Sequence, residues 1–279
     1  MSNSVAVFHG AFGRVCLFDM DRRMVPHGHR EGHVIFHVQG PPGEMVVGED
    51  AYPISPGQAV AVSPWQTHYY RPVSDAGTTL ALVLYIRPGW FLEAARAAAA
   101  TLAFGRNGIE VTDQLARLVY GTAQTMIDPD TYDPLLEERV CDLTQLAYDQ
   151  SWQWTPRGRD FTGPEMPRRD YRIRNALRIL QGRLGETVDL DGVAREVGLS
   201  RPHFYKLFRA QVGLTPNLYL NALRMESAID RLAETREAVT EIGFDLGFSS
   251  QASFSRFFIA NGVVPPSDYR RSVCSALLS

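Results

Sequence analysis

The strongest constraint on the fold is an internal repeat in the last third of this 279-residue chain. Each copy has an apolar stripe of helical spacing, a short glycine-containing break and a second apolar stripe. The first stripes lie 49 residues apart and the second stripes 50 residues apart. The first copy consists of Val193, Ala194 and Val197, the break 198–200, and Phe204, Leu207 and Phe208. The second consists of Ile242, Gly243 and Leu246, the break 247–249, and Phe254, Phe257 and Phe258.

This pattern predicts two helix-turn-helix units, and two matching copies are much stronger evidence than one. Ser200 can cap the second helix of the first unit. Between the units, Thr215 can cap and Pro216 can open a helix that continues to about Glu234. A helix of that length spans roughly 28 Å at 1.5 Å per residue. Neighbouring major-groove faces of B-DNA lie roughly 34 Å apart, so this helix could hold two recognition helices at adjacent grooves.

Residues 187–271 resemble the DNA-binding domain of AraC/XylS-type transcription regulators. The resemblance lies in LDGVAREVGLSRPHFYKLFRAQVGLTPNLYLNALRMESAIDRL (190–232) and VTEIGFDLGFSSQASFSRFFIANGVVPPSDYR (239–270). It implies a regulator, usually an activator, whose partners are double-stranded promoter DNA and RNA polymerase. Two features depart from the family pattern. Gly243 stands where alanine is usual, at a helix cost of about 1 kcal/mol, and the stretch 258–262 is one residue short.

The resemblance also implies which side chains meet DNA. In the first unit these are Arg201, Pro202, Tyr205, Lys206 and Arg209, and in the second they are Ser250, Gln251, Ser255 and Arg256. The chemistry of three of them agrees independently, because Lys206, Gln251 and Arg256 can bind purine edges in the major groove. Arg201 and Arg209 can hold phosphates, whereas Pro202 offers no side-chain hydrogen bond. For Tyr205 and Ser255 the alternative is a solvated helix face.

The first 90 residues alternate short apolar runs with glycine and proline, which predicts a β-sandwich or barrel. The expected strands cover 33–40, 44–54, 57–64 and 78–86. Four histidines gather in this part: His27, His29 and His33 in PHGHREGH, and His68 in SPWQTH. Their spacing resembles the two cupin motifs H-x-H-(x)3-E and G-(x)10-H. Gly57 and His68 fit the second motif, His33 replaces the glutamate of the first, and Ser63 replaces a usual proline.

Two alternatives remain open for this N-terminal domain. Neutral imidazoles suit Zn, Fe, Ni or Cu, and strand alternation would put His27 and His29 on one face. The histidines would then form a divalent metal site. Alternatively they line a pocket for a small organic effector or are hydrogen-bonded core residues. Such a pocket would take its walls from Phe36, His37, Trp65 and Tyr70, although Phe36 could equally be ordinary core.

The remaining stretches define the domain organisation. Helices are expected over 93–103, 110–127 and 132–149, and the apolar stripe of the last of these contains Leu136, Val140, Leu143 and Ala147. That stripe could pair two protomers as a homodimer or pack on the barrel. We therefore expect an α+β chain: a cupin-like effector domain (1–90), a helical connecting segment (91–150), a linker (151–168) and an all-α DNA-binding domain (169–279).

Charge and composition further restrict the classes of function that this chain can have. From residue 168 onward the chain carries a net charge of +4, whereas residues 1–167 carry −7, which hints at a nucleic-acid partner for the C-terminal part. Cys16, Cys141 and Cys274 are far apart, and no signal peptide or membrane span is apparent, so a cytoplasmic protein is expected. No nucleophile triad, phosphate loop or carboxylate pair stands out. The competing hypotheses are a metal-dependent cupin enzyme with a helical extension and a helical adaptor that binds protein.

Overall fold

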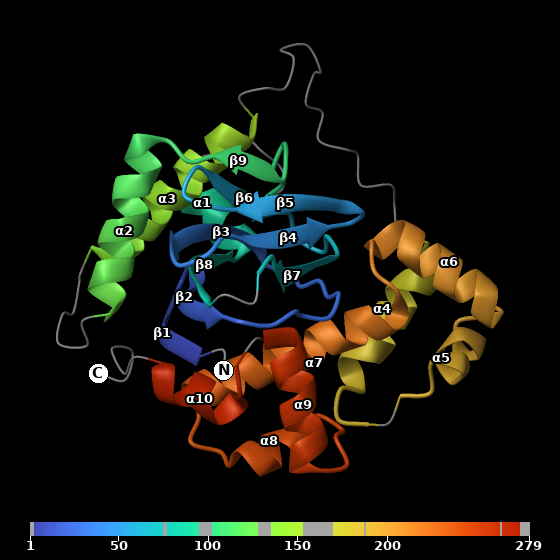
Figure 1. Ribbon diagram of the computed structural model, residues 1–279. Coiled ribbons are helices and arrows are strands. Elements are labelled where there is room, and N and C mark those ends of the chain that lie inside the picture. The colour runs from blue at the N-terminus through green and yellow to red at the C-terminus, as the bar shows by residue number, and fades with distance from the viewer. Residues whose placement is uncertain are drawn as a thin grey trace.

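The structure is a computed structural model that describes residues 3–74, 77–94, 102–127, 135–152, 170–186, 188–262 and 264–273. A β-rich N-terminal part is followed by helices that cover one of its faces, and a wholly helical C-terminal part lies beneath and beside it (Figure 1). The expected α+β architecture is therefore confirmed. No helix in these ranges combines the length and the apolar character needed to cross a lipid bilayer.

The N-terminal part contains two antiparallel sheets. Its strands are β1 (Asn3–Gly10), β2 (Gly13–Met20), β3 (Gly32–Gln39), β4 (Gly43–Val47), β5 (Asp50–Ile54), β6 (Gln58–Val62), β7 (His68–Pro72), β8 (Thr79–Ile86) and β9 (Gly108–Glu110). The six-stranded sheet has the order β1-β2-β8-β3-β6-β9 and the three-stranded sheet the order β5-β4-β7. Apolar side chains of both sheets meet in one interior cluster, so the two sheets form the expected sandwich.

Strand alternation divides the six-stranded sheet into two faces with different environments. On β3, Ile35 lies in the interior between the sheets, whereas Val34 and Phe36 belong to a second cluster on the outer face. That outer face is covered by α2 (Asp113–Ile127) and α3 (Leu136–Trp152), and it also receives Phe91 of α1 (Pro88–Ala94). Consequently, inward-facing residues such as His33 share their face with Ile35.

The apolar stripe of α3 packs on this sheet. Val140, Leu143 and Ala147 are fully buried among the side chains of the outer face, and Leu136 packs at its margin. Of the two alternatives that the stripe left open, the structure therefore shows packing on the barrel. A second copy of the chain could not use these three side chains without unfolding that layer.

The C-terminal helices reproduce the internal repeat. They are α4 (Tyr171–Gly182), α5 (Leu190–Glu196), α6 (Arg201–Val212), α7 (Pro216–Glu234), α8 (Val239–Asp245), α9 (Gln251–Gly262) and α10 (Pro266–Ser272). Helices α5 and α8 are offset by 49 residues and α6 and α9 by 50, as the sequence predicts. Both breaks contain a glycine with positive φ, 73° at Gly198 and 83° at Gly247, a backbone conformation that favours glycine.

The capping predictions have different outcomes. The hydroxyl of Thr215 accepts a hydrogen bond from the backbone N–H of Leu218, and Pro216 opens α7. Ser200 occupies the position before α6, but its side chain makes no capping hydrogen bond. The expectation that Ser200 caps this helix through its hydroxyl is therefore wrong, and Pro202 in the first turn helps to begin α6 instead.

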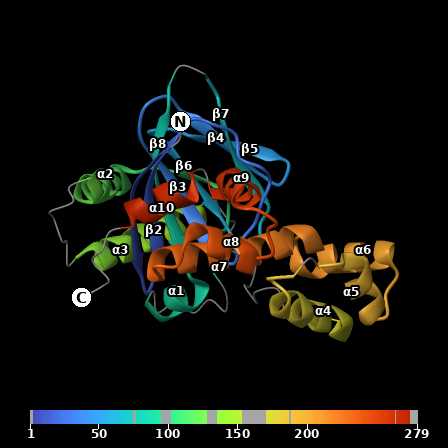
Figure 2. The same cartoon turned by 90° about the horizontal axis from the view of Figure 1, so that it is seen from below.

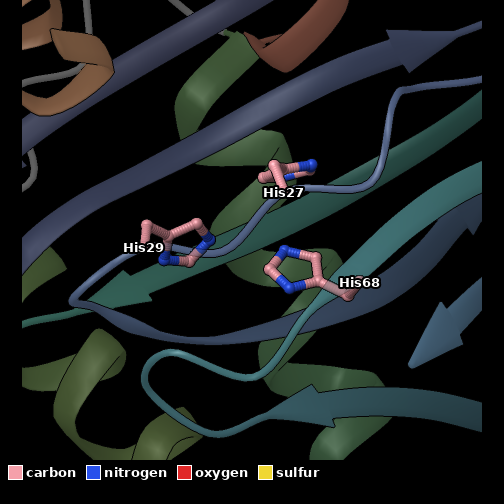
Figure 3. A group of neighbouring side chains, drawn as sticks. All are labelled: His27, His29 and His68. Atoms are coloured by element: carbon pink, nitrogen blue, oxygen red, sulfur yellow. The ribbon is translucent and has the colours of Figure 1, made fainter. Parts of the chain in front are cut away.

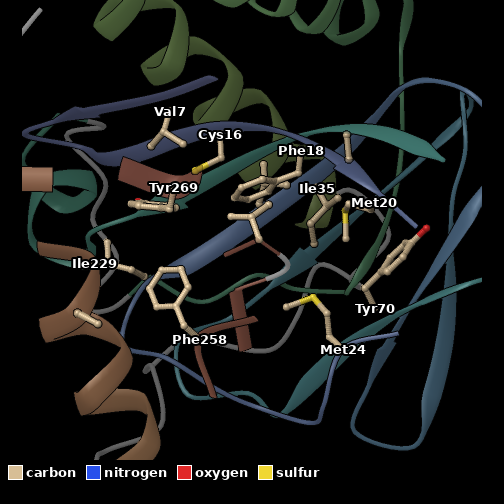
Figure 4. Close-up of a cluster of buried hydrophobic side chains, with 14 of the residues drawn as sticks. Val7, Cys16, Phe18, Met20, Met24, Ile35, Tyr70, Ile229, Phe258 and Tyr269 are labelled. Atoms are coloured by element: carbon tan, nitrogen blue, oxygen red, sulfur yellow. The ribbon is translucent and has the colours of Figure 1, made fainter. Parts of the chain in front are cut away.

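The two helix-turn-helix units bury their phenylalanines in separate cores. The first unit has its own cluster, built from α4, α5, α6 and the first half of α7. The second unit shares one continuous cluster with the barrel interior, in which Ile229, Phe258 and Tyr269 lie beside Cys16, Phe18 and Ile35 (Figure 4). Figure 2 shows the same division, with α8, α9 and α10 against the barrel and α4, α5 and α6 standing to one side.

Several predicted boundaries differ from the structure. The run 44–54 contains two strands joined at Gly48, whose φ of 64° turns the chain. The expected helix 110–127 begins at Asp113, because residues 108–110 pair with β6. Most of the expected helix 93–103 and nearly all of the linker 151–168 lie outside the described residues, as does Cys274. Cys16 and Cys141 are free thiols.

Candidate functional site

The exposed face of α6 carries the side chains predicted for the first DNA contact. Arg201, Pro202, Lys206 and Arg209 are exposed, whereas Phe204 and Phe208 on the opposite face are fully buried. Arg201 forms an ion pair with Asp191 at 3.2 Å (Nε to Oδ1). An exposed pair of this kind contributes little, so Arg201 can exchange Asp191 for a phosphate.

Tyr205 and Arg209 border a shallow hollow on the same side of α6. Lys206, Ala210 and Thr215 complete its lining. The half-buried Tyr205 accepts a hydrogen bond from Asn217 Nδ2 at 3.4 Å through its hydroxyl oxygen. This contact joins the exposed face of α6 to the first turn of α7.

The corresponding face of α9 carries the second predicted set. Gln251 and Arg256 are exposed, and Ser255 is half-buried, while Phe254 and Phe258 are fully buried. The amide oxygen of Gln251 accepts a hydrogen bond from the Thr240 hydroxyl at 3.0 Å, which restrains its side chain at the start of the helix. Ser250 is engaged with Ser253 in the turn before α9.

The two recognition helices are not parallel. α6 runs across the page in Figures 1 and 2, whereas α9 runs down the page in Figure 1 and is strongly foreshortened in Figure 2. This differs from the side-by-side arrangement that adjacent major grooves require. The structure therefore shows an arrangement in which one helix can enter a groove but the pair is not aligned for two.

All four predicted histidines come together at the mouth of the barrel. Residues 27 and 68 form an antiparallel bridge, with backbone hydrogen bonds of 3.0 and 2.9 Å in the two directions. The His68 ring centroid lies 4.4 Å from that of His27, 5.0 Å from that of His29 and 4.3 Å from that of His33. In Figure 3 the rings of His27, His29 and His68 point toward one another.

Hydrogen bonds fix the orientation of three imidazoles. Nδ1 donates to a backbone carbonyl in each case, from His27 to Val25 at 2.9 Å, from His29 to Glu31 at 2.8 Å, and from His68 to Gln66 at 2.7 Å. A carbonyl oxygen only accepts, so the proton is on Nδ1 and the lone pair is on Nε2. This is the second-sphere pattern of histidines that ligate metals.

The lone pairs of the cluster are buried without partners. Among the residues that the structure describes, Nε2 of His29, Nε2 of His68 and both ring nitrogens of His33 make no hydrogen bond. Burial lowers the pKa of His27, and it lowers the pKa values of His29, His33 and His68 well below the usual 6.5. The mutual repulsion of the imidazoles acts in the same direction. Near neutral pH all four rings are therefore uncharged, and each has a nitrogen lone pair that can bind a metal ion.

This donor set fits a divalent transition metal ion. One ligand atom each from His27, His29 and His68 can be chosen so that all three lie within 4.8 Å of one another, and His33 adds a fourth imidazole on the inward face of β3. Neutral imidazoles suit Zn, Fe, Ni or Cu and are poor ligands for Mg or Ca. Glu31, the nearby carboxylate, is engaged with Arg14 at 3.0 Å.

A buried arginine next to the histidines was not predicted from the sequence. The Arg14 guanidinium lies 3.8 Å from the centre of the Tyr85 ring, and Tyr85 packs 5.4 Å from the rings of both His29 and His33. Burial raises the pKa of Tyr85, so its hydroxyl stays protonated. Parity along β2 would have indicated Arg14, since it shares the inward face with Cys16 and Phe18.

A small cavity lies between the histidines and the C-terminal helices. Its volume is about 40 Å³, and its lining includes Arg14, His27 and His29 from the barrel and Met225, Glu226 and Tyr269 from the helices. A cavity needs about 10–15 Å³ to hold one water molecule, whereas pockets for drug-sized ligands have about 300–1,000 Å³. The space admits an ion with a few water molecules.

The four residues expected to bind an organic effector do not meet around this cavity. Phe36 faces the outer helical layer, because alternation along β3 turns it away from the interior; its place in a barrel pocket is therefore corrected. His37 donates a hydrogen bond from Nε2 to the carbonyl oxygen of Gly40, and the Tyr70 hydroxyl is hydrogen-bonded to that of Thr79 within the core. Trp65 has a φ of 64° and packs 5.3 Å from Tyr219 of α7.

Comparison with known families agrees with this architecture. Residues 14–138 match the AraC-like ligand binding domain, and residues 193–272 match a helix-turn-helix domain. The TetD protein of transposon Tn10 from Escherichia coli is 34% identical over 100 residues, which are 36% of this chain and 72% of TetD. The chain belongs to the AraC family of transcription regulators.

Other relatives match over little more than a third of this chain. The regulatory protein PocR of Salmonella typhimurium is 33% identical over 104 residues, which are 37% of this chain and 34% of PocR. The lactose operon transcription activator of Staphylococcus xylosus is 29% identical over 98 residues, 35% of either chain. The matched stretch thus spans about a third of the length of these two relatives.

Solved structures of one protein resemble nearly the whole chain. An apo variant of ToxT from Vibrio cholerae superimposes with a TM-score of 0.61 at 12% identity, covering 95% of this chain and 98% of that chain. Wild-type ToxT with a bound unsaturated fatty acid gives a TM-score of 0.54 at 13% identity, covering 93% and 95%. At these identities the likeness concerns the two-domain fold.

Proposed function

We propose that this protein is a sequence-specific DNA-binding transcription regulator whose promoter binding is modulated by a ligand of its N-terminal domain. One observation carries the proposal: the two helix-turn-helix units each bury their phenylalanines and expose a polar, basic recognition face. Lys206 and Arg256 occupy equivalent positions on these faces, where an Nζ or a guanidinium can reach a guanine edge.

The division of labour follows the domain organisation expected from the sequence. Residues 1–90 contribute β1 to β8 of the ligand-binding domain, 91–150 the connecting helices together with β9, 151–168 the linker and 169–279 the DNA-binding domain. The partners are double-stranded promoter DNA, a small ligand and RNA polymerase, with activation as the output, by analogy with the lactose operon activator. Such a protein works in the cytoplasm. A homodimer would need a surface other than the buried stripe of α3.

The domain arrangement provides an equilibrium that a ligand can shift, namely the docking of the second helix-turn-helix unit on the barrel. The second unit is held against the barrel by a shared core, and α6 and α9 are not parallel. Binding two adjacent grooves therefore requires the second unit to move relative to the first. A ligand that binds the docked and undocked arrangements with different affinities shifts their populations and so changes promoter occupancy.

The site argues against an enzyme. A metal-dependent cupin enzyme needs room for a substrate beside the ion, but the cavity of about 40 Å³ is smaller than ordinary ligand pockets. An organic effector as large as the fatty acid bound by ToxT would likewise need the two domains to separate. The helical adaptor hypothesis leaves the basic faces of α6 and α9 without a role.

Genome-wide mapping of bound DNA, followed by binding measurements on a recovered site, tests this function. Fluorescence anisotropy with a labelled duplex of that site should show an association constant that falls linearly with salt on logarithmic axes, because bound phosphates release counterions. A duplex of scrambled sequence should bind at least 10³-fold more weakly. Failure to recover any enriched site, or a flat salt dependence, would contradict the proposal.

A further inference from the structure

We infer that the ligand of this regulator is a late first-row divalent metal ion held by His27, His29, His33 and His68. We further infer that the segment 25–30 connects the occupancy of this site to the docking of the DNA-binding domain. The inference rests on the proposed function for its biological meaning, whereas the site and the connection are physical properties of the chain.

The first argument is the unsatisfied donor set. Three imidazoles have their Nδ1 protons fixed by backbone carbonyls. Of the remaining nitrogens, Nε2 of His29, Nε2 of His68 and both ring nitrogens of the adjacent His33 are buried without a hydrogen-bond partner. Lone pairs buried without partners are costly in a folded protein. A tetrahedral ion with bonds of about 2.0–2.1 Å would place its donors about 3.4 Å apart. The donors of His27, His29 and His68 lie within 4.8 Å of one another and need a shift of only about 1 Å to reach that spacing.

The second argument is that one short segment carries both ligands and interdomain contacts. Val25 donates its backbone N–H to Ala260 O of α9 at 3.2 Å. The backbone N–H of Arg30 donates to Glu226 Oε1 of α7 at 3.1 Å, and its guanidinium lies 3.6 Å from Oε2. Between these contacts are His27 and His29, so a change at the ligands reaches two helices of the DNA-binding domain through at most two peptide units.

Close packing reinforces this connection. A Cβ atom at residue 28 would lie 2.9 Å from Leu214 Cδ2, so the backbone between the two ligands touches the turn before α7. The carbonyl of His29 accepts a hydrogen bond from Trp65 N at 2.8 Å, and the Trp65 ring packs on Tyr219. The segment 25–30 therefore cannot rearrange independently of α7 and α9.

The direction of the coupling follows from the docked arrangement. Here the four rings already face one another while Val25 and Arg30 are bonded to the helices, so the ion binds best to the docked protein. By linkage, an ion that prefers this arrangement stabilises it and opposes the alignment of α6 and α9 on DNA. Coupling between sites of this kind is commonly 5–150-fold, and we expect about tenfold weaker DNA binding in the presence of the ion.

Metal titration of the full-length chain tests the site. After treatment with a chelator, the protein should bind one equivalent of Co²⁺ with visible d–d absorption of a four-coordinate complex, and Zn²⁺ should displace it. The double variant His27→Ala/His68→Ala should lose both signals, while His203→Ala, which removes an exposed histidine of α6, should keep them. Stoichiometric binding that survives the double change, or no binding by the wild type, would overturn the site.

Hydrogen exchange tests the connection. Zn²⁺ should slow amide exchange about tenfold in α9 and in the second half of α7, with no change in α4. The variant Glu226→Ala removes the acceptor for Arg30 but leaves all four histidines, so it should still bind one Co²⁺ and lose most of the Zn²⁺-dependent protection. Equal protection in the wild type and in this variant, or protection confined to the barrel, would overturn the connection.

The two failures can be distinguished. If the metal-free protein binds its mapped DNA site with the expected salt dependence but takes up no ion, the inference fails and the proposed function stands. If the ion binds and protects α9 but no DNA site is recovered, the proposed function fails and the metal-controlled docking remains.

Discussion

Phe204 and Phe254 occupy equivalent positions in the two helix-turn-helix units but lie in different hydrophobic cores. Both rings are fully buried. Phe204 packs among helices of its own unit, including Phe208 at a centroid distance of 5.5 Å. Phe254 belongs to the cluster that continues into the barrel, where Phe18 and Ile35 are members. The repeated sequence has therefore produced two units with different structural attachments.

Replacing each phenylalanine by alanine should distinguish the core that belongs to the first unit from the core that the second unit shares with the barrel. Truncation of a buried phenylalanine costs about 3–5 kcal/mol, so both variants should be destabilised. Phe254→Ala should also speed amide exchange in β2 and β8, because these strands share its core, whereas Phe204→Ala should leave them protected. Hydrogen exchange followed by mass spectrometry gives the comparison. Equal exchange of the barrel strands in both variants would contradict a shared core.

The docking of α10 on β1 should weaken in acid because of His9. Its Nε2 lies 3.1 Å from the Tyr269 hydroxyl, and burial, assisted by the charges of Arg14 and Arg87, lowers the pKa of His9 to about 4. An undocked His9 would take up a proton near pH 6.5, whereas the docked one stays neutral. The stability from docking is therefore complete above pH 6.5 and falls as the pH drops toward 4, by at most about 3 kcal/mol.

The variant His9→Gln isolates this effect from that of the other histidines. Its side chain does not titrate, so the difference in unfolding free energy between wild type and variant should change between pH 7 and pH 4 and be constant above pH 7. Thermal unfolding monitored at several pH values provides the measurement. A difference that is the same at pH 7 and pH 4.5 would exclude His9 as the origin.

Glycine at position 243 should make the protein more stable than the alanine that is usual at this position in the family. A Cβ atom there would lie 2.9 Å from Phe254 Cβ and 3.0 Å from its Cγ, which is too close to accept without movement. Overpacking costs about 1–3 kcal/mol, against a gain of about 1 kcal/mol in helix propensity. Gly243→Ala should therefore lower the melting temperature slightly. Ala210→Gly, at an exposed position of α6, is a control that measures the difference in helix propensity between alanine and glycine alone. A higher melting temperature of Gly243→Ala would contradict the prediction and show that α8 can shift to accept the Cβ atom.

Arg256 and Arg209 should affect DNA binding in different ways. If Arg256 binds a base edge, Arg256→Ala should reduce discrimination at one base pair by about 1–3 kcal/mol. If Arg209 binds a phosphate, Arg209→Ala should weaken binding to all sequences alike and reduce the salt slope by about one. Arg178→Ala on the exposed surface of α4 serves as a control of equal charge. Anisotropy titrations with single-base variants of the mapped site distinguish the two roles. If Arg256→Ala weakens binding to all sequences alike and Arg209→Ala reduces discrimination at one base pair, then Arg256 binds a phosphate and Arg209 binds a base edge.

The C-terminal part could be predicted closely because its signals are local. The glycines at 198 and 247, the stripes on either side and the Thr215–Pro216 start of α7 each act within one or two turns of helix. The docking of the second unit has no comparable signal. Ile229, Phe258 and Tyr269 are apolar or aromatic residues that any helical core would need, and nothing in their spacing distinguishes contact with the barrel.

In the N-terminal part, the sequence located histidines that lie together in space but misplaced Phe36, one residue of the expected effector pocket. The motif spacing of His27, His29, His33 and His68 located residues that meet in space, since a barrel brings the ends of β3 and β7 together. Phe36 was misplaced because an aromatic residue in a fully apolar run gives no indication of its face. Arg14 was missed because its importance depends on Glu31 and Tyr85, which are remote in sequence.

The shared core of the barrel and the second helix-turn-helix unit limits how this protein can be divided or recombined. Cleavage between Trp152 and Asp170 would leave Cys16, Phe18 and Ile35 on one fragment and Phe258 and Tyr269 on the other without their apolar neighbours. Each piece would then tend to aggregate. Chimaeras that exchange sensors among relatives should therefore carry α8, α9 and α10 together with the barrel, which requires one junction between Trp152 and Asp170 and a second within α7.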